Sequence, residues 1–379
     1  MNFIVSTSEL LNKLQIINGV IGTNTVLPIL EDILFDIDKN ALTLFATDLE
    51  TSMSTQMEIE CKESGKFAIP AKILIDTLKK LPNQPLTFQI NDSTKAIKII
   101  SDNGEYKLSG ENGDDFPKMP IPENITGTKA KSSSLLKAIG STLFATGNDE
   151  LRAPMTGVLF QMDPDCSTFI ATDAHRLVRY KRNEIKTSEA TAFIVPKKAL
   201  NLLRNSLPND DTNVNLNYNN SNAFFDYGDT KLICRLIDGK YPDYNAVIPK
   251  NNNNILVVNK SELLGSLNRV AIYSNKTTNL IRLRITGSEI NISAEDIDFA
   301  NEAQERLGCQ YNGEDMEIGF NAKFLIEMLL NIGSDEVSIE LSSATKAGII
   351  LPSKENEDSD EDVLMIVMPV MLNVEAPVV

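Results

Sequence analysis

The chain has 379 residues, a formal net charge of −16 and a single histidine. One hydrophobic core seldom extends over so many residues, so about three domains are expected. The acidic balance excludes a protein that coats nucleic acid by charge attraction alone, because such binding requires a basic surface.

The first expected elements are a short strand at Asn2–Val5 and an amphipathic helix. Ser6 and Glu9 have the spacing of a capping box, which predicts the start of the helix. Apolar residues then recur at helical intervals between Leu10 and Ile17. An alternating strand follows at 42–45 and runs into the tripeptide Ala46-Thr47-Asp48.

A second helix is expected to begin at Pro70 and to run through Leu74, Leu78 and Leu81. Proline costs no hydrogen bond in the first turn of a helix, so its place there is favourable. Further strands complete a unit that contains two amphipathic helices.

The same landmarks return twice in the same order, at a period of about 125 residues. The turn recurs as Ala171-Thr172-Asp173 and, more weakly, as Ala294-Glu295-Asp296; the segment Phe67–Lys72 recurs as Phe193–Lys198 and Ile318–Lys323; and Ser8–Leu11 recurs as Ser133–Leu136 and Ser261–Leu264. Because this period far exceeds that of solenoid repeats, each unit is a domain. The pattern predicts an α+β fold of three similar domains.

Two connectors set the expected domain limits. Proline and asparagine are concentrated at 120–124 and 249–254, where neither helix nor sheet is favoured. We therefore predict domains at 1–125, 126–252 and 253–379. The last domain ends in the apolar segment 363–372, in which Pro369 suggests an edge strand and the methionines suggest an adaptable partner site.

Catalytic chemistry finds little support. The lone His175 lies near Thr172 and Asp173, but the first repeat has the same Thr-Asp pair without a histidine, which favours turn chemistry over a hydrolytic triad. The four cysteines are scattered without a CxxC pair, which argues against a zinc site and fits a reducing cytoplasm. No metal and no cofactor are expected.

Cations recur on the expected helices of this otherwise acidic chain. They are ordinary solvated residues or a shared basic surface, and the repetition favours the second reading: Lys13, Lys72, Lys137, Lys198, Arg204, Arg269 and Lys323. The acidic run between Glu355 and Asp362 is expected to be a solvated loop.

Over nearly its whole length the chain resembles the bacterial DNA polymerase III beta subunit family, the sliding clamps. The matching segments are Leu27–Leu30, Ala171–Asp173 with His175–Leu177, Tyr241–Tyr244, Met316–Asn321 and Val367–Pro369. The resemblance implies three similar domains per chain and a ring-shaped homodimer around double-stranded DNA. It implies a non-catalytic processivity factor that binds DNA without sequence preference through the helix cations.

The resemblance also implies a site for short peptide motifs of polymerase, clamp loader and repair proteins. That site would use Met155, Thr172, His175, Arg176, Leu177, Pro242, Val247, Asn321, Phe324, Val367, Met368, Pro369 and Leu372. In the dimer, Tyr106 and Leu108 would contact Ile272 and Tyr273 of the second chain. The rim residues His175 and Arg176 would orient the peptide.

The sequence departs from the family pattern in places. Asn24 and Asp149 stand where some relatives place DNA-contacting residues, Met371 stands where a basic residue is common, and 373–379 extend beyond the usual end. Two alternatives stay open at this point: a three-domain scaffold that never encircles DNA, and a hydrolase that uses Asp173 and His175.

Overall fold

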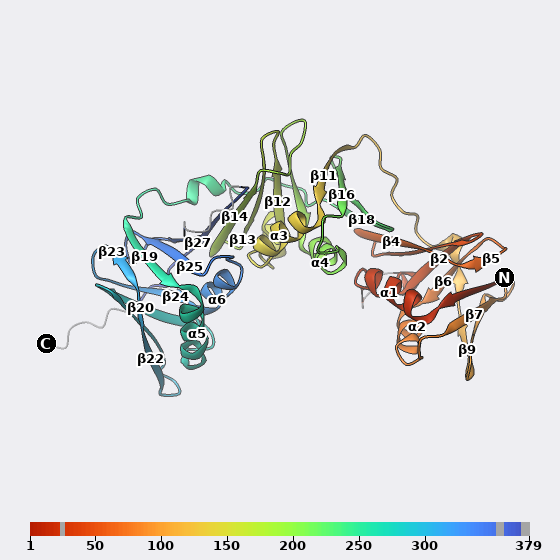
Figure 1. The fold of residues 1–379 in the computed structure, drawn as a ribbon, viewed down its shortest axis with the longest axis horizontal. Coiled ribbons are helices and arrows are strands. Elements are labelled where there is room, and N and C mark those ends of the chain that lie inside the picture. The colour runs from red at the N-terminus through yellow and green to blue at the C-terminus, as the bar shows by residue number, and fades with distance from the viewer. Residues whose placement is uncertain (23–26, 354–359, 373–379) are drawn as a thin grey trace. The chain divides into compact units, whose positions relative to one another are not determined.

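The computed structural model describes residues 1–22, 27–353 and 360–372 (Figure 1). The chain packs as two compact units, one formed by 1–136 with 195–236 and the other by 137–194 with 237–379. We call them unit 1 and unit 2. Asn24, most of the acidic run and the C-terminal extension lie outside the described residues.

Six α-helices occur in the described residues, two for each repeat, as predicted. They are α1 (Thr7–Asn18), α2 (Ala71–Leu78), α3 (Ser132–Leu143), α4 (Lys197–Ser206), α5 (Lys260–Val270) and α6 (Ala322–Leu330). The predicted apolar stripe is confirmed in α1, where Leu10, Leu14 and Ile17 are fully buried.

Helix boundaries differ from the prediction in two respects. Ser6 occupies the N-cap position of α1, but its side chain caps nothing, because its hydroxyl lies 3.2 Å from both Ser8 Oγ and Asn83 Oδ1. Asn259 does cap α5, since its Oδ1 accepts a hydrogen bond from the Glu262 N–H. Pro70 ends a strand instead of opening α2, which stops at Leu78.

Unit 1 contains two antiparallel sheets. The smaller has the order β5 (Glu60–Cys61), β1 (Asn2–Ser6), β7 (Pro85–Ile90), β8 (Ala96–Ser101) and β9 (Gly104–Ser109). The larger has the order β10 (Glu111–Asn112), β6 (Gly65–Pro70), β2 (Asp32–Asp38), β3 (Ala41–Thr47), β4 (Thr51–Glu58), β18 (Thr230–Arg235), β17 (Asn222–Tyr227), β16 (Asn213–Tyr218) and β11 (Thr126–Lys131). The larger sheet thus joins strands of the first and second repeats through the β4–β18 pair.

Unit 2 repeats this arrangement. One sheet has the order β15 (Thr191–Pro196), β12 (Gly157–Met162), β13 (Ser167–Thr172), β14 (Arg176–Arg182), β27 (Glu361–Val367), β26 (Gly348–Pro352), β25 (Glu336–Leu341), β19 (Asn254–Asn259) and β23 (Gln310–Asn312), of which only the end of β15 belongs to unit 1. The other has the order β22 (Asn301–Gly308), β21 (Glu289–Asp296), β20 (Leu280–Thr286) and β24 (Met316–Asn321). Here the β14–β27 pair joins the second and third repeats.

The prediction that the C-terminal strand lies at the edge of a sheet is wrong. β27 lies inside the nine-stranded sheet, paired with β14 on one side and β26 on the other. Pro369 follows the strand and interrupts no ladder bond. Met365, Ile366 and Val367 are buried, so the strand is part of the core of unit 2.

Among the described residues, no helix is both long enough and apolar enough to span a bilayer.

Asp32 is a buried carboxyl at the start of β2. Its side chain is 6 % exposed. Loss of hydration on burial, together with the negative charges of Glu111 and Glu31, raises its pKa to about 6. Because the folded-state pKa exceeds the unfolded value, protonated Asp32 favours the folded state below pH 4, and this contribution is lost as the pH rises through 6.

We therefore expect Asp32→Asn to increase the free energy of unfolding at pH 8 relative to the parent chain, by about 1–2 kcal/mol. The difference should shrink toward pH 4, where the parent carboxyl is already neutral. Urea titrations at several pH values measure it, with Glu60→Gln, an exposed carboxyl on β5, as the control. A gain that does not vary with pH would show that the charge of Asp32 is not the cause.

Candidate functional site

The turn that follows β13 owes its shape to Thr172 and Asp173. Thr172 Oγ1 donates a hydrogen bond to Arg176 O at 2.7 Å, and it accepts one from the Ala174 N–H at 3.1 Å. Asp173 Oδ1 accepts hydrogen bonds from the N–H groups of His175 and Arg176 at 2.9 and 3.0 Å. These bonds hold Ala174 at a φ of 75°.

The first repeat contains the same turn. Thr47 Oγ1 accepts a hydrogen bond from the Leu49 N–H at 3.0 Å, and Asp48 Oδ1 accepts hydrogen bonds from the N–H groups of Glu50 and Thr51. Leu49 has a φ of 76°. The prediction that the Thr-Asp pair is turn chemistry is therefore confirmed. His175, the residue considered for catalysis, stacks its ring on Phe324 with centroids 6.2 Å apart.

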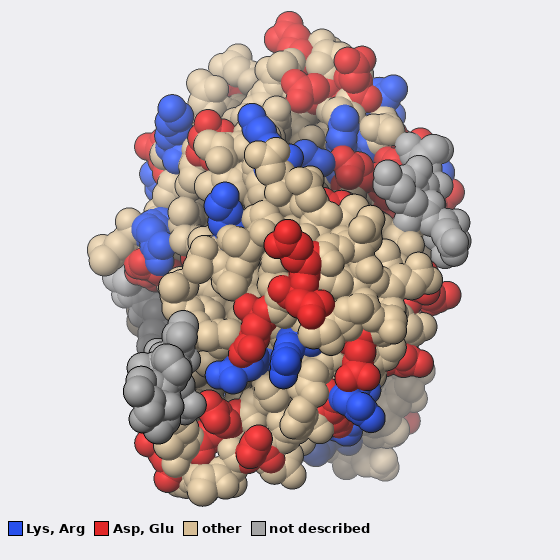
Figure 2. Space-filling model, turned by 90° about the vertical axis from the view of Figure 1, so that its left-hand side faces the viewer, with Lys and Arg blue, Asp and Glu red and all other residues tan. Residues whose placement is uncertain are grey.

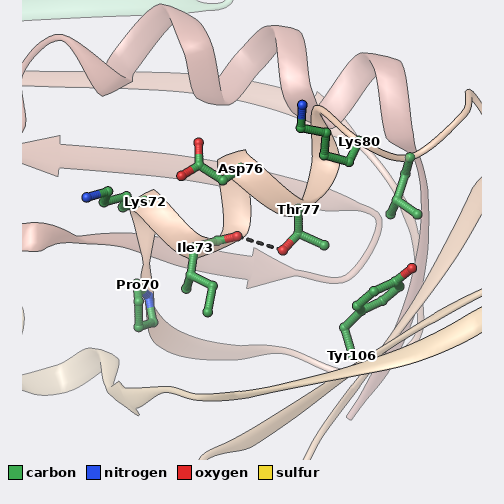
Figure 3. A pocket seen from close by; sticks show the side chains of 8 residues that line it. Pro70, Lys72, Ile73, Asp76, Thr77, Lys80 and Tyr106 are labelled. Atoms are coloured by element: carbon green, nitrogen blue, oxygen red, sulfur yellow. Dashed lines mark hydrogen bonds between the residues drawn. The ribbon is translucent and has the colours of Figure 1, made fainter.

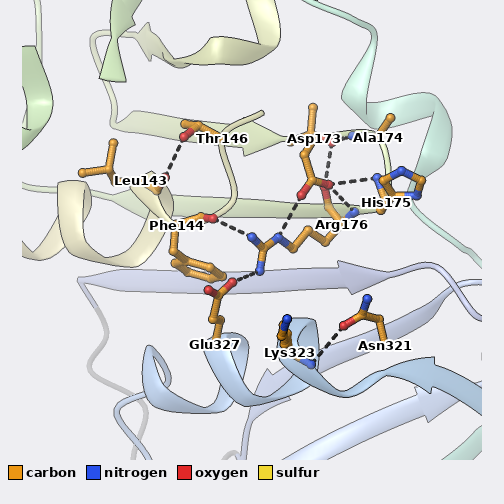
Figure 4. Close-up of polar contacts among 11 residues, drawn as sticks. Leu143, Phe144, Thr146, Asp173, Ala174, His175, Arg176, Asn321, Lys323 and Glu327 are labelled. Atoms are coloured by element: carbon orange, nitrogen blue, oxygen red, sulfur yellow. Dashed lines mark hydrogen bonds and ion pairs between the residues drawn. The ribbon is translucent and has the colours of Figure 1, made fainter. Parts of the chain in front are cut away.

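Arg176 connects this turn to α6 (Figure 4). The side chain is 8 % exposed, and its Nε donates a hydrogen bond to Asp173 Oδ2 at 3.1 Å. One terminal nitrogen pairs with Glu327, and the other donates a hydrogen bond to Phe144 O at 2.7 Å. The guanidinium also lies 4.6 Å from the ring centroid of Phe324. The arginine predicted to orient a peptide at the rim is thus buried, and it fastens α6 to β14.

The pairing of β14 with β27 brings the predicted apolar residues together. Arg176 is opposite Val367 and Leu177 is opposite Ile366, and the Met368 N–H donates a hydrogen bond to His175 O at 2.8 Å. Leu177 is 3 % exposed and belongs to a buried cluster that also includes Leu159, Ile170, Ile194, Tyr241, Ala347 and Ile366. The strand pair therefore forms the floor of the candidate site.

The segment after β27 runs along β24. The Val370 N–H donates a hydrogen bond to Gly319 O at 2.8 Å. A Cβ on Gly319 would lie 2.6 Å from Val370 O and 2.8 Å from a methyl carbon of Leu372, so only glycine permits this close approach. Leu372 is thereby held beside the strand that leads to Asn321, whose Oδ1 caps α6 at the Lys323 N–H. Gly319 belongs to a repeated landmark, but its role was not predicted.

Exposed apolar side chains lie around this floor. Val247, at the end of the 3₁₀ segment Tyr244–Val247, is 57 % exposed, and Met368 is 46 % exposed. Tyr244 and Ile248 beside Val247 pack against the Leu177 cluster, and Pro242 follows the cluster residue Tyr241. Met155 lies on another segment, where its carbonyl accepts a hydrogen bond from the Gly147 N–H. The surface combines a rigid floor with adaptable exposed groups.

Most of the predicted helix cations are engaged in ion pairs. Lys198 Nζ contacts Asp48 Oδ2 at 2.5 Å and donates a hydrogen bond to Val20 O. The other ion pairs are Lys13–Asp229 at 3.3 Å, Lys137–Glu361 at 2.6 Å and Arg269–Glu305 at 2.6 Å. In the part of the chain that the structure describes, Lys72, Arg204 and Lys323 have no carboxylate partner.

Charges of both signs also mix on the face shown in Figure 2, with no continuous basic patch. This face belongs to the side of unit 2 where β20, β22 and β23 are labelled in Figure 1.

The predicted dimer residues lie at two separate places. Tyr106 on β9 borders a cavity of about 730 Å³ beside α2 (Figure 3). The other lining residues are Pro70, Lys72, Ile73, Asp76, Thr77, Lys80 and Leu81. Leu108 is half-buried on the same strand. In unit 2, Ile272 and Tyr273 on the 3₁₀ segment Ala271–Tyr273 are 65 % and 43 % exposed.

The chain repeats one domain three times, and its sheets continue from one repeat into the next. The Thr-Asp pairs, one of which was considered for catalysis, shape turns. Together these features define a clamp-type scaffold. Three family models match the chain: the N-terminal domain of the DNA polymerase III beta subunit at 1–120, its central domain at 129–243 and its C-terminal domain at 245–370.

Individual relatives agree over the full length. A beta sliding clamp of Synechococcus elongatus is 30 % identical and aligns over 98 % of this chain and 100 % of its own. A crystal structure of the sliding clamp from Pseudomonas aeruginosa bound to griselimycin superposes with a TM-score of 0.91 at 27 % identity, covering 98 % of this chain and 100 % of that one. A Bartonella birtlesii clamp bound to the same compound gives the same TM-score and identity.

The chain belongs to the DNA polymerase III beta subunit family. It is a DNA sliding clamp that serves polymerase processivity and is not itself an enzyme. The hydrolase considered from the sequence is thereby set aside.

Proposed function

We propose that two copies of this chain close head to tail into a ring around double-stranded DNA. The observation that carries the proposal is the pair of repeat junctions within the chain. At each one, an antiparallel strand pair, β4–β18 or β14–β27, continues a sheet from one repeat into the next. In the first repeat the strand equivalent to β18 and β27 is β9, and in the third repeat the strand equivalent to β4 and β14 is β22. Among the described residues each of these two strands ends its sheet without such a partner. In a head-to-tail dimer, β9 of each copy would pair with β22 of the other copy, and these two contacts would close the ring.

The repeats also define the register of this contact. Tyr106, Leu232 and Met365 occupy equivalent positions in the three repeats. In each repeat, a path that starts four residues before the first helix and follows three strand pairings across the sheet ends at one of these residues. Leu232 is opposite Met53, and Met365 is opposite Val178. The β22 residue equivalent to Met53 and Val178 is Ala303, since all three pair with the alanine of the repeated tripeptide. Ala303 should therefore be opposite Tyr106 of the second copy.

The neighbouring pair in this register is chemically compatible. Glu302 would be opposite Lys107 of the second copy, an ion pair on the exposed face of the strands. Opposite charges across antiparallel strands are stabilising by about 0.2–1 kcal/mol. Ala303 and Tyr106 are half-buried and share the other face, so the alternation of the two strands agrees.

Oxidation of a doubly substituted chain tests this register. Ala303→Cys together with Tyr106→Cys should form disulfide-linked dimers, because residues directly opposite have Cβ atoms about 4.5–5.5 Å apart. The natural Cys166 and Cys309 are replaced by Ser in all variants, since they are partly exposed. The control moves one cysteine by a single residue, to Lys107, whose side chain points to the opposite face. Linkage in the control alone would contradict the register.

Contact with DNA is proposed to be loose and independent of sequence. Lys72, Arg204 and Lys323 would contact phosphates, because the other helix cations are held in ion pairs. Phosphate contacts position a protein without reading bases, so they permit sliding. Closure of the ring, not charge, would retain a chain with a net charge of −16 on DNA.

The apolar surface around Leu177 and Met368 is proposed to bind short extended peptides. By resemblance these peptides contain a glutamine and large apolar residues and belong to polymerase, clamp loader and repair proteins. The exposed Met368 and Val247 support this role, because unbranched and accessible apolar groups adapt to different partners. The four free cysteines fit action in the cytoplasm.

A further inference from the structure

The second helix of each repeat has a lysine as its second residue. These equivalent lysines are Lys72 in α2, Lys198 in α4 and Lys323 in α6. In the described part of the chain, Lys72 and Lys323 have no carboxylate partner, whereas Lys198 Nζ lies 2.5 Å from Asp48 Oδ2. Only one of the three equivalent positive charges is therefore neutralised by an aspartate.

Asp48 uses its two carboxylate oxygens for different purposes. Oδ1 accepts hydrogen bonds from the N–H groups of Glu50 and Thr51 at 3.0 and 2.6 Å, and these bonds shape the turn after β3. Oδ2 pairs with Lys198, whose Nζ also donates a hydrogen bond to Val20 O at 2.7 Å. The ion pair is thus separate from the bonds that form the turn.

The equivalent turn of the second repeat leaves its helix lysine unpaired for a visible reason. Asp173 shapes that turn through Oδ1 in the same way, but its Oδ2 accepts a hydrogen bond from Arg176 Nε at 3.1 Å (Figure 4). In the first repeat Thr51 takes the place of Arg176, since the N–H of each is bonded to Oδ1 of the turn aspartate. Threonine carries no positive charge, so Oδ2 of Asp48 pairs with Lys198 instead.

We infer that Asp48 lowers the affinity of this clamp for DNA by neutralising Lys198. The inference rests on the phosphate contacts proposed above for the helix cations. A phosphate that approaches Lys198 has to displace a carboxylate already in place, so the contact contributes little to binding. Every phosphate contact must be broken before the ring moves along DNA. Asp48 therefore favours sliding over tight binding.

Fluorescence anisotropy with a short linear duplex measures direct binding of the full chain to DNA over a series of salt concentrations. Asp48→Asn should bind about 5-fold more tightly at low salt, because one charge contact in water is restored. The plot of log K against log salt should steepen by about 0.9 for each phosphate newly contacted. The amide of the variant keeps an oxygen for the two N–H groups of the turn, and circular dichroism establishes that the fold is retained.

The matched control is Asp36→Asn, which changes the net charge by the same amount. Asp36 pairs with Lys66 at 2.7 Å, and Lys66 is 48 % exposed, compared with 41 % for Lys198. Both residues of the control pair lie on strands, β2 and β6, so the affinity for DNA should not change. An equal gain in this control would show that net charge, and not Lys198, is the cause.

A second substitution assigns the gain to one lysine. Lys198→Gln added to the Asp48→Asn chain should remove the gain, because the two changes act on the same contact. A gain that persists in this double variant would overturn the inference, as would the absence of any gain in Asp48→Asn.

Lys323→Gln in the otherwise unchanged chain tests the phosphate contacts themselves. It should weaken direct binding about 5-fold, since Lys323 has no carboxylate partner among the described residues. An unchanged affinity would contradict the proposed contact of the helix cations with DNA, and the inference with it. A loss in Lys323→Gln without a gain in Asp48→Asn would overturn the role of Asp48 alone.

Discussion

Replacing Ile272 and Tyr273 together by Asp is expected to convert the proposed ring dimer into monomers at micromolar concentration. Both side chains are largely exposed in the single chain, and burial of an apolar side chain of this size contributes about 1.5–3 kcal/mol. The loss is doubled because the proposed ring has two seams, and each seam would also bury two new carboxylates. The dissociation constant should therefore rise by at least about 10⁴-fold.

Sedimentation velocity measures this change directly. The matched control is Ile121→Asp in the connector after the first repeat, because Ile121 is 79 % exposed and lies on neither free strand. Dimers that persist in the Ile272→Asp, Tyr273→Asp variant would place the seam elsewhere on the surface.

The second large effect is expected at the apolar surface around Leu177 and Met368, where we propose that peptides bind. Met368→Ala combined with Val247→Ala should weaken the binding of a short peptide that carries a glutamine and large apolar residues by about 100-fold, since anchors of this kind contribute about 1–3 kcal/mol each. Both side chains are exposed, so the fold and the ring should be unaffected. Leu177→Ala is less informative, because Leu177 lies in the buried cluster and its loss would cost about 2–5 kcal/mol of folding free energy.

Isothermal titration calorimetry with a synthetic peptide provides the measurement. Ile4→Ala on β1 serves as the control, because Ile4 is 42 % exposed, close to the value for Met368, but lies in unit 1. Equal affinity in the double variant and the parent would show that the peptide binds at another place.

Local patterns in the sequence predicted the elements well. The spacing of Leu10, Leu14 and Ile17 fixed the buried face of α1, and the repeated Thr-Asp pair predicted two turns with the same hydrogen bonds. Both features depend on residues close together in the chain. Their physical causes, helical periodicity and short side-chain bonds to the backbone, are therefore visible in the sequence.

Interactions between distant residues were harder to predict. β27 pairs with β14 across some 185 positions, and nothing in the apolar segment indicates that both of its edges are occupied. The cations on the helices were recognised, but for Lys13, Lys137 and Lys198 the carboxylate partner lies in another repeat, as Asp229 does for Lys13. The burial of Arg176 likewise depends on Glu327 and Phe144, which no motif includes.

Retention on circular DNA tests most directly whether this chain encircles DNA. Clamps loaded on a nicked circle should remain bound at a salt concentration that abolishes direct binding of the free protein to DNA, because a closed ring is held by topology and not by charge. Cutting the circle once with a restriction enzyme should release them, since the ring then slides off the ends. Clamps that stay on the linearised DNA, or that leave the intact circle at the same salt concentration as the free protein, would contradict encirclement.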